Sequence, residues 1–254
     1  ALRQRGQPGA RLADQDAPVA VIAQPATLTC ATAQVIINAT ASTSGPTYVY
    51  QWTGPGIVSG ATSATLVVDL PGIYTLLITN NANGCTDTES VQVGIDIAPP
   101  GADAGASVLL NCFNPQVSVG GAGNPTGPQY QFEWSGPGIV SGQNTPNPTV
   151  NQGGVYTLVV TNTTNGCTSQ AQTTANTDFD PPLAEAGPGF LLTCVDNQYT
   201  MQSNVSQGTQ YAYQWSSING NFMGPTNVPN PTVNAPGVYV LTVTNTINGC
   251  TAQS

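Results

Sequence analysis

The chain has very little charge and lacks two residue types that most enzymes use. It contains no histidine and no lysine, and only 6% of its residues are charged. Without histidine the common catalytic triads and histidine metal sites are excluded, and without lysine so is Schiff-base chemistry. The few acids are spread along the sequence, which disfavours a facing carboxylate pair of the glycosidase type. We therefore predict that the protein is not an enzyme and needs no cofactor.

The charge is also one-sided, which bears on the partners. Arg3, Arg5 and Arg11 are the only cations, and the net charge is −9. Everything after Arg11 is purely acidic and would repel nucleic acid. No stretch approaches 18 consecutive apolar residues, so no membrane insertion is predicted. Neutral polar side chains supply the polarity instead, and neutral surfaces associate more readily than charged ones.

What the chain does contain is one frame repeated three times. A cysteine, a tryptophan, a Gly-x-Tyr and an Asn-Gly-Cys follow one another in each copy, and the copies recur about every 82 residues. A repeat of this length is the signature of tandem domains. It predicts an N-terminal arm at 1–16 followed by domains at 17–97, 98–179 and 180–254.

The cysteines are shared out evenly, two to a copy. Zinc is a poor explanation, because the chain has neither a Cys-x-x-Cys pair nor a histidine. A domain of about 80 residues has a small core and gains much from a disulfide. We predict one disulfide within each copy and hence an extracellular or cell-surface location. The predicted pairs are Cys30–Cys85, Cys112–Cys167 and Cys194–Cys250.

Short runs with a period of two predict β-strands. Aromatic residues alternate in Tyr48–Trp52, and Tyr74, Leu76 and Ile78 share one face of a later run. Turn sequences separate the runs, and no helical periodicity occurs. The pattern predicts an all-β chain of three tandem Ig-like β-sandwich domains. The predicted core residues are Trp52, Trp134, Trp215, Tyr74, Tyr156 and Tyr239.

The phrase Gly-x-Tyr-x-Leu-x-Val-Thr-Asn, with Tyr-x-Trp upstream, resembles the PKD-like and Ig-like repeats of large secreted bacterial adhesins and filaments. Such repeats are abundant in surface proteins of the Bacteroidota. The resemblance covers residues 17–254. It implies a secreted cell-surface stalk, filament or adhesin. The Trp-Asp-Phe-Gly-Asp-Gly of typical PKD repeats is absent.

Acids gather beside the prolines at the predicted domain junctions. Clustered carboxylates suit calcium, which can stiffen such joints, although a solvated linker is the simpler explanation. No metal is therefore assigned. The calcium candidates are Asp96, Asp103, Asp178, Asp180 and Glu185.

The two ends of the chain complement each other. The third copy stops soon after its second cysteine, so its last strand is predicted to be missing, whereas residues 1–16 carry a spare strand-like segment. We expect strand donation from residues 9–16 of one subunit to the third copy of the next, giving a head-to-tail polymer. A frame cut from a longer tandem array explains the ends equally well. The predicted interface residues are Ala10, Arg11, Leu12, Ala13, Asp14, Thr251, Ala252 and Gln253.

These observations predict a structural subunit of an extracellular bacterial filament or surface stalk, whose partners are copies of itself. The alternative is a piece of a long tandem-repeat adhesin whose modules bind a protein or a host or cell-surface glycan. Ser217–Gly224 replaces the Gly-Pro-Gly loop of the other copies and offers Phe222 and Met223. This loop is the candidate binding feature, although simple sequence drift also explains it.

Overall fold

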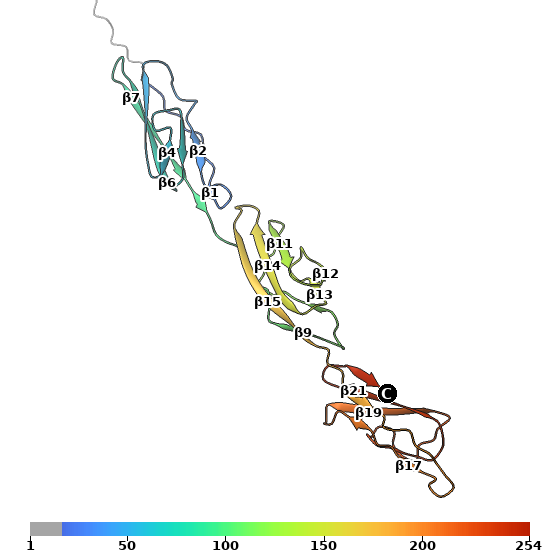
Figure 1. Ribbon diagram of the computed structural model, residues 1–254. Helices are drawn as coiled ribbons and strands as arrows, with labels where there is room; N and C mark the ends of the chain where they lie inside the picture. Colours follow the sequence, from blue (N-terminus) through green and yellow to red (C-terminus); the bar gives the residue numbers. More distant parts are fainter. Residues whose placement is uncertain (1–16) are drawn as a thin grey trace, which may run out of the picture. The chain divides into compact units, whose positions relative to one another are not determined.

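A computed structural model describes residues 17–254 and contains strands and loops, with no helix among these residues (Figure 1). The all-β prediction is thus confirmed. Because no helix forms, none that could span a membrane is found in the described part of the chain. In the first copy the strands are β1 (Leu28–Thr29), β2 (Val35–Asn38), β3 (Tyr48–Thr53), β4 (Ile57–Ser59), β5 (Thr65–Val68), β6 (Gly72–Asn80), β7 (Thr86–Val93) and β8 (Ile95–Asp96).

The first copy is a sandwich of two antiparallel three-stranded sheets. One sheet has the order β2-β5-β4 and the other β3-β6-β7. Side chains from both sheets meet in a single core, in which Ile37, Leu66, Trp52, Tyr74 and Ile78 are almost fully buried. The alternation along β6 places Tyr74, Leu76 and Ile78 inward, as the period of two predicts.

The second copy repeats this arrangement with one longer sheet. Its sheets have the orders β10-β13-β12 and β11-β14-β15-β9, and β9 runs parallel to β15 at the edge. Trp134, Tyr156, Leu158 and Val160 are buried. The strands are β9 (Val108–Asn111), β10 (Val117–Ser118), β11 (Tyr130–Ser135), β12 (Ile139–Ser141), β13 (Thr149–Val150), β14 (Gly154–Asn162) and β15 (Thr168–Asp178).

The third copy is the least regular. It contains one three-stranded sheet of order β19-β21-β22 and two separate two-stranded sheets, β16-β18 and β17-β20. No strand forms at 190–193, the counterpart of β1 and β9. The strands are β16 (Ala184–Glu185), β17 (Tyr199–Thr200), β18 (Asn204–Val205), β19 (Tyr211–Ile218), β20 (Thr232–Val233), β21 (Val238–Asn245) and β22 (Thr251–Gln253).

The last strand of the third copy is short but present, so the prediction that it is missing is wrong. Ala252 of β22 pairs with Val243 of β21, and Ser254 exchanges backbone hydrogen bonds with Leu241. In the first copy, by contrast, β7 pairs with β6 along its whole length, from Thr86 to Val93. The pairing in the third copy therefore covers only the part of β21 after Tyr239.

The tyrosine of Gly-x-Tyr fixes the same corner in every copy. The hydroxyl of Tyr74 donates to the carbonyl of Leu70 at 2.5 Å, and Tyr239 donates to Ala235 at 2.6 Å. The hydroxyl of Tyr156 donates to Gln152 in the same way. A tyrosine bonded to the backbone a few residues upstream is a feature of immunoglobulin sandwiches. Burial raises the pKa of Tyr74 and Tyr156 above the usual tyrosine range.

Contacts between residues divide the chain into two compact units rather than three. The first unit holds the residues up to Pro100 together with Gly127–Tyr130 and Thr161–Ser169. The second unit holds Gly101–Thr126, Gln131–Val160 and Gln170–Ser254. A hairpin of the second copy thus groups with the first copy. The division into domains at 17–97, 98–179 and 180–254 stays a prediction.

Candidate functional site

The disulfides join neighbouring copies, so the predicted pairing within each copy is wrong. Cys30 of the first copy bonds to Cys167 of the second, and Cys112 of the second bonds to Cys250 of the third. The Cα atoms are 5.0 Å apart in both bonds. The chain is therefore covalently linked from copy to copy at two equivalent points, which we call the joints.

Strand geometry explains why the two cysteines of one copy do not pair. Cys30 follows Thr29, which lies opposite Asp96 of β8. Cys85 precedes β7, at the other end of the extended segment that leads to Asp96. Eleven residues of extended chain span roughly 35 Å. A disulfide needs Cα atoms within about 7 Å, so the two cysteines of one copy lie too far apart.

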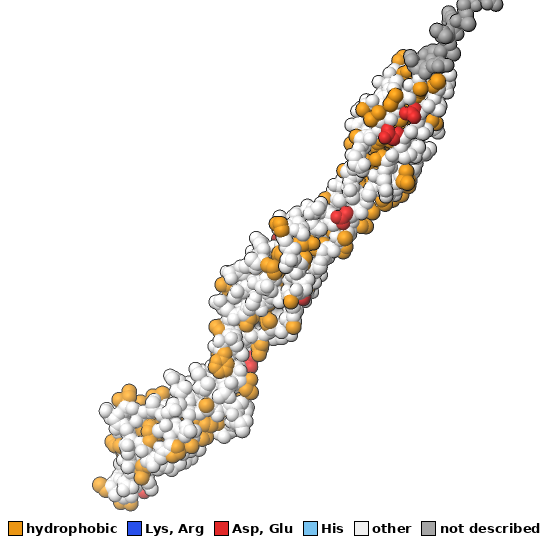
Figure 2. All heavy atoms as spheres, turned by 180° about the vertical axis from the view of Figure 1, so that it is seen from behind, with side chains coloured by type: hydrophobic (Ala, Val, Ile, Leu, Met, Phe, Trp, Pro, Cys, Tyr) orange, Lys and Arg blue, Asp and Glu red, His pale blue; other side chains and the backbone are white. Residues whose placement is uncertain are grey.

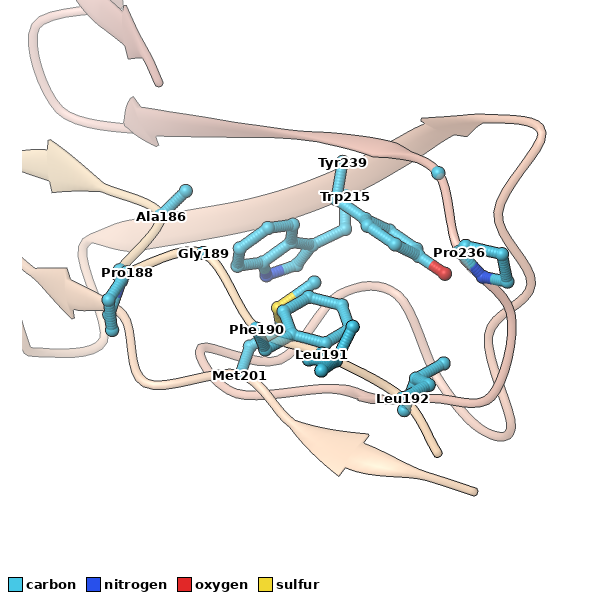
Figure 3. Close-up of a pocket in the computed structure, with 12 residues that line it drawn as sticks. Ala186, Pro188, Gly189, Phe190, Leu191, Leu192, Met201, Trp215, Pro236 and Tyr239 are labelled. Carbon is cyan, nitrogen blue, oxygen red and sulfur yellow. The ribbon is translucent and has the colours of Figure 1, made fainter. Parts of the chain in front are cut away.

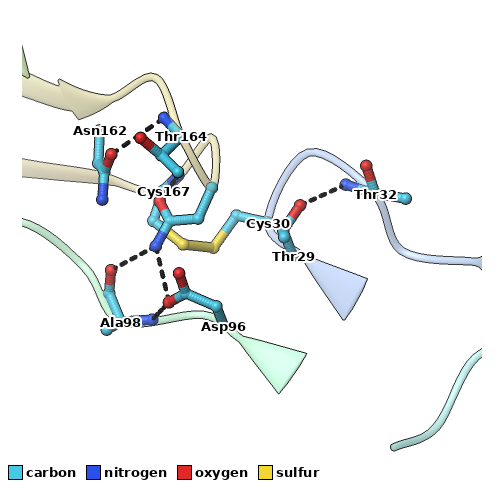
Figure 4. The surroundings of a disulfide bond; sticks show 9 residues. Thr29, Cys30, Thr32, Asp96, Ala98, Asn162, Thr164 and Cys167 are labelled. Atoms are coloured by element: carbon cyan, nitrogen blue, oxygen red, sulfur yellow. Dashed lines mark hydrogen bonds between the residues drawn. A yellow bond between two sulfur atoms is a disulfide. The ribbon is translucent and has the colours of Figure 1, made fainter. Parts of the chain in front are cut away.

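Each joint carries a buried asparagine from the Asn-Gly-Cys hairpin. The side-chain amide of Asn165 donates to Asp96 and to the carbonyl of Ala98, both at 3.0 Å (Figure 4). Its oxygen accepts the backbone N–H of Cys167 at 3.0 Å. With 1% of its surface exposed, Asn165 is satisfied entirely by these partners. The hairpin is thereby tied to the segment that ends the preceding copy.

The second joint repeats these contacts. Asn248 donates to Asp178 at 2.7 Å and to the carbonyl of Asp180 at 3.0 Å, and it accepts the N–H of Cys250 at 2.9 Å. It is 1% exposed. Two independent joints with the same donors, acceptors and disulfide show that the contact is a property of the repeat rather than of one local sequence.

The glycine of Asn-Gly-Cys permits close packing at both joints. A Cβ on Gly166 would lie 2.4 Å from the Cβ of Ala31, and one on Gly249 would lie 2.5 Å from the ring of Phe113. Both glycines have a positive φ, of 73° and 75°. A side chain is thus excluded by the turn conformation and by the neighbouring copy together.

The calcium candidates serve as hydrogen-bond acceptors instead. Asp96 and Asp178 bind the joint asparagines, and Glu185 accepts from the amide of Asn204 at 2.8 Å. Asp180 contributes its backbone carbonyl. No group of three His, Cys, Asp or Glu side chains that could hold a metal occurs between residues 17 and 254. The junction acids therefore do not gather as a calcium site requires.

Asp103 organises a loop inside the second copy. Its two carboxylate oxygens accept the backbone N–H groups of Gly105 at 2.9 Å and Gly123 at 2.8 Å. These bonds favour the ionised form and lower the pKa of Asp103 below its usual value. Asn124 completes the loop by bonding to both the N–H and the carbonyl of Asp103.

A cavity of about 430 Å³ opens in the third copy. Figure 3 shows Trp215 and Tyr239 on one side of it and Phe190 and Met201 on the other. Phe190 stacks on Tyr199 with ring centroids 4.3 Å apart, and it lies 6.0 Å from Tyr239. The lining side chains are mostly apolar, and three of them, Phe190, Trp215 and Tyr239, are aromatic.

The cavity lies where the first copy places the end of its last strand. In the first copy Val93 of β7 lies opposite Gly72 and is 1% exposed. Gly237, the counterpart of Gly72, lines the cavity of the third copy. Leu192 also lines it, whereas its counterparts Leu28 and Leu110 are 3% and 0% exposed in filled cores. The cavity therefore lies at the place that the end of β7 fills in the first copy, and its lining side chains are mostly apolar.

The predicted site residues fall into three groups. The three tryptophans, Tyr74 and Tyr156 are buried, and Tyr239 is half-buried. The interface residues Ala10–Asp14 lie outside the described residues, whereas Thr251, Ala252 and Gln253 form β22. In the unusual loop Phe222 packs edge-on against Tyr239 at 5.2 Å, so of the two candidate side chains only Met223 is exposed. The sequence reasoning missed both the joints and the cavity.

The surface outside these sites is nearly uncharged. On the face drawn in Figure 2, acidic side chains are few, and apolar and uncharged atoms make up most of the surface. Apolar side chains such as Leu191 and Val195 are 82% and 88% exposed. Such a surface offers little electrostatic repulsion to another copy of the same molecule.

Comparison with known proteins gives matches of structure only. No protein-family model matches the chain, and neither does any curated protein sequence. A solved structure of titin domains I67–I69 is 15% identical, with a TM-score of 0.41, over 93% of this chain and 95% of that one. Three N-terminal domains of the Hoc capsid protein of bacteriophage RB49 are 14% identical, with a TM-score of 0.35, over 93% and 95% of the two chains. Extracellular domains 3–5 of Drosophila OTK are 12% identical, with a TM-score of 0.27, over 98% and 97%.

Proposed function

We propose that the protein is a structural subunit of an extracellular filament or surface stalk, of the secreted bacterial kind that the sequence resemblance implies. The observation that carries this proposal is the repeated joint, in which a disulfide and a buried asparagine link each copy to the next. An enzyme or a freely diffusing binding module has no need of such links. An array of modules under mechanical tension needs such links, because covalent bonds between the modules keep them from separating.

The location follows from the same bonds. Disulfides persist in oxidising compartments and are rare in the cytosol of mesophiles. Two of them between copies support an extracellular or cell-surface site. The scarcity of charge over the surface, seen in Figure 2, suits a molecule that packs against its own kind.

Assembly proceeds head to tail by strand donation. Residues 9–16 of one subunit enter the third copy of the next, where the cavity beneath Trp215 and Tyr239 receives an apolar side chain such as Leu12. The backbone of β21 before Leu241 has no strand on the β22 side among the described residues, so it can pair with the incoming segment. This contact joins different surfaces of the two molecules and does not close, so it gives a polymer.

Deletion of the arm tests this assembly. The chain lacking residues 1–16 is expected to stay monomeric, whereas the chain lacking only residues 1–8 keeps the donor segment and is expected to polymerise. Electron microscopy and sedimentation of both variants give the readout. Polymers of equal length from the two variants would refute strand donation.

A second candidate function is adhesion, in which the modules belong to a long tandem array and bind a glycan or a protein. The aromatic cavity of the third copy favours it, since aromatic side chains stack on sugar rings. Binding of a glycan array by the arm-deleted chain, lost on Phe190→Ala in the cavity wall but kept on Phe179→Ala outside it, would favour this function over strand donation.

A further inference from the structure

Two cysteines remain as thiols, and they are of opposite kinds. Cys85 and Cys194 have no disulfide in the structure. Cys85 belongs to the Asn-Gly-Cys hairpin, like Cys167 and Cys250, which bond to the copy before them. Cys194 belongs to the early segment, like Cys30 and Cys112, which bond to the copy after them.

The hairpin around Cys85 already has the geometry of the bonded hairpins. The N–H of Cys85 donates to Asn83 at 2.9 Å, and its carbonyl accepts from the N–H of Asn80 at 2.9 Å. Cys167 makes the same two bonds, to Asn165 at 3.0 Å and from Asn162 at 2.9 Å. The backbone around Cys85 thus has the conformation of a bonded hairpin, although Cys85 forms no disulfide within this chain.

The turn around Cys194 likewise matches the turns of its bonded counterparts. The N–H of Thr193 donates to the carbonyl of Asp196 at 2.9 Å, as Thr29 does to Thr32 at 2.9 Å and Asn111 to Asn114 at 3.1 Å. Cys194 is exposed at the surface. A cysteine of each kind is therefore present in the chain without a disulfide.

The surfaces beside the two thiols also complement each other. At the existing joints, Ala31 and Phe113 follow the early cysteine and pack on the glycine of the partner hairpin. Their counterpart beside Cys194 is Val195, an apolar side chain left 88% exposed. A Cβ built on Gly84 meets no described atom within 4 Å, so the hairpin of Cys85 has room for Val195.

We propose that Cys194 of one molecule forms a disulfide with Cys85 of a second copy, which makes the assembly a covalent polymer. This inference rests on the head-to-tail assembly proposed above. It extends the repeated joint across the contact between molecules, with Val195 seated against Gly84 and the hairpin of Cys85 docked as the hairpins of Cys167 and Cys250 are.

The bond forms by exchange with a disulfide oxidant, either a small molecule or an oxidoreductase. The exposed thiolate of Cys194 attacks one sulfur of the oxidant and releases one thiolate, which leaves a mixed disulfide. The thiolate of Cys85 then attacks the Cys194 sulfur and displaces the second thiolate. The two protein thiols lose two electrons and two protons in total, and the oxidant is reduced to two thiols.

Single-cysteine variants test the pairing. Cys85→Ser keeps only the thiol of Cys194, and Cys194→Ser keeps only the thiol of Cys85. In buffer with glutathione disulfide the unaltered chain is expected to give a ladder of multimers on non-reducing gels. Each variant alone is expected to stay monomeric, and an equimolar mixture is expected to give one dimer and nothing larger. Peptic mapping of that dimer should find Cys85 linked to Cys194.

Three results would overturn the proposal. Either variant alone could dimerise as readily as the mixture, which would indicate random thiol pairing. The unaltered chain could lose both thiols while remaining a monomer, which would indicate a bond within one molecule. Both thiols could also stay reduced while bound to a neighbour. The double variant Cys85→Ser/Cys194→Ser separates these failures from failure of the filament proposal, because non-covalent polymers of it remain visible by electron microscopy.

Discussion

Replacement of Asn165 by alanine is expected to weaken one joint and leave the other unchanged. The substitution removes two hydrogen bonds that tie the hairpin to the end of the first copy, to Asp96 and to Ala98. It also leaves the buried N–H of Cys167 without its acceptor. Neither Asn248 nor the Cys112–Cys250 bond takes part in these contacts.

The size of the effect follows from the two bonds that cross the joint. A typical hydrogen bond contributes about 0.5–1.5 kcal/mol net, and one to a charged group contributes more. Asp96 is exposed, so water screens its part of the contact. We therefore expect the free energy of docking the hairpin to fall by about 2 kcal/mol. The hydrogen bond from Cys167 to Asn165 is left out of this sum, because it lies within the hairpin and does not hold the copies together.

Docking of the hairpin sets how often Cys30 and Cys167 meet when both are reduced. A loss of about 2 kcal/mol corresponds to roughly a 30-fold lower equilibrium constant for forming that disulfide, since about 1.4 kcal/mol is tenfold. Equilibration with mixtures of reduced and oxidised glutathione, followed by alkylation and mass spectrometry of each cysteine peptide, measures this constant for both bonds.

The matched control is Asn248→Ala, which should lower the constant for Cys112–Cys250 alone. The reasoning is refuted if Asn165→Ala changes both disulfides equally, or if it changes neither. An equal loss would mean that the two joints are not independent, and no loss would mean that the buried asparagine does not hold the hairpin in place.

Three further predictions concern single positions. Gly166→Ala is expected to lower the equilibrium constant for forming the Cys30–Cys167 disulfide more than tenfold, because the new methyl group would lie 2.4 Å from Ala31. Gly84→Ala is the control, because it carries the same strain of a positive φ without that collision. It should leave both disulfides of the monomer intact. Asp103 has a lowered folded-state pKa, so its contribution to stability is present above an unfolded pKa of about 3.9 and is lost as the pH falls through the folded value. Thermal unfolding between about pH 5 and pH 2 should therefore show a smaller acid-dependent loss in Asp103→Asn than in the unaltered chain. Trp134→Ala removes a fully buried side chain and should cost about 3–5 kcal/mol in chemical unfolding of the second copy, without a change in either disulfide.

Periodicity was sufficient for the parts of the fold that depend on local sequence. The alternation in β3 and β6 places Trp52, Tyr74 and Leu76 inside a sandwich, and the structure buries all three. A period of two specifies which face of a strand is buried, whatever the strand packs against. Trp134, Tyr156 and Trp215 follow the same rule, whereas Tyr239 is half-buried.

The disulfide pairing was not predictable from the even distribution of cysteines. Two cysteines in one repeat suggest a bond within it, yet the extended chain after Cys85 carries the end of the copy roughly 35 Å away. That length was a signal available in the sequence, because the second cysteine opens a long final strand. The repeat is equally compatible with disulfides between copies, because Cys167 holds the same position in the second copy as Cys85 does in the first.

The cavity and the loop of the third copy depend on long-range packing. Phe222 looked free to bind a ligand, but it packs against Tyr239, seventeen positions further along the sequence, through a fold that no local pattern specifies. Leu192 holds the position in the repeat at which Leu28 and Leu110 are buried, but it lines an open cavity. Departures from the repeat of this kind depend on the partner strands rather than on the residues themselves.

The measurement that tests the central claim most directly is a disulfide map of the monomer. Peptic digestion without reduction, followed by mass spectrometry, identifies each pair of linked peptides. Peptides joining Cys30 to Cys167 and Cys112 to Cys250, with Cys85 and Cys194 alkylated as free thiols, are the predicted result. Peptides joining Cys30 to Cys85 or Cys112 to Cys167 would contradict the account, because the copies would then be closed individually and nothing covalent would hold them to one another.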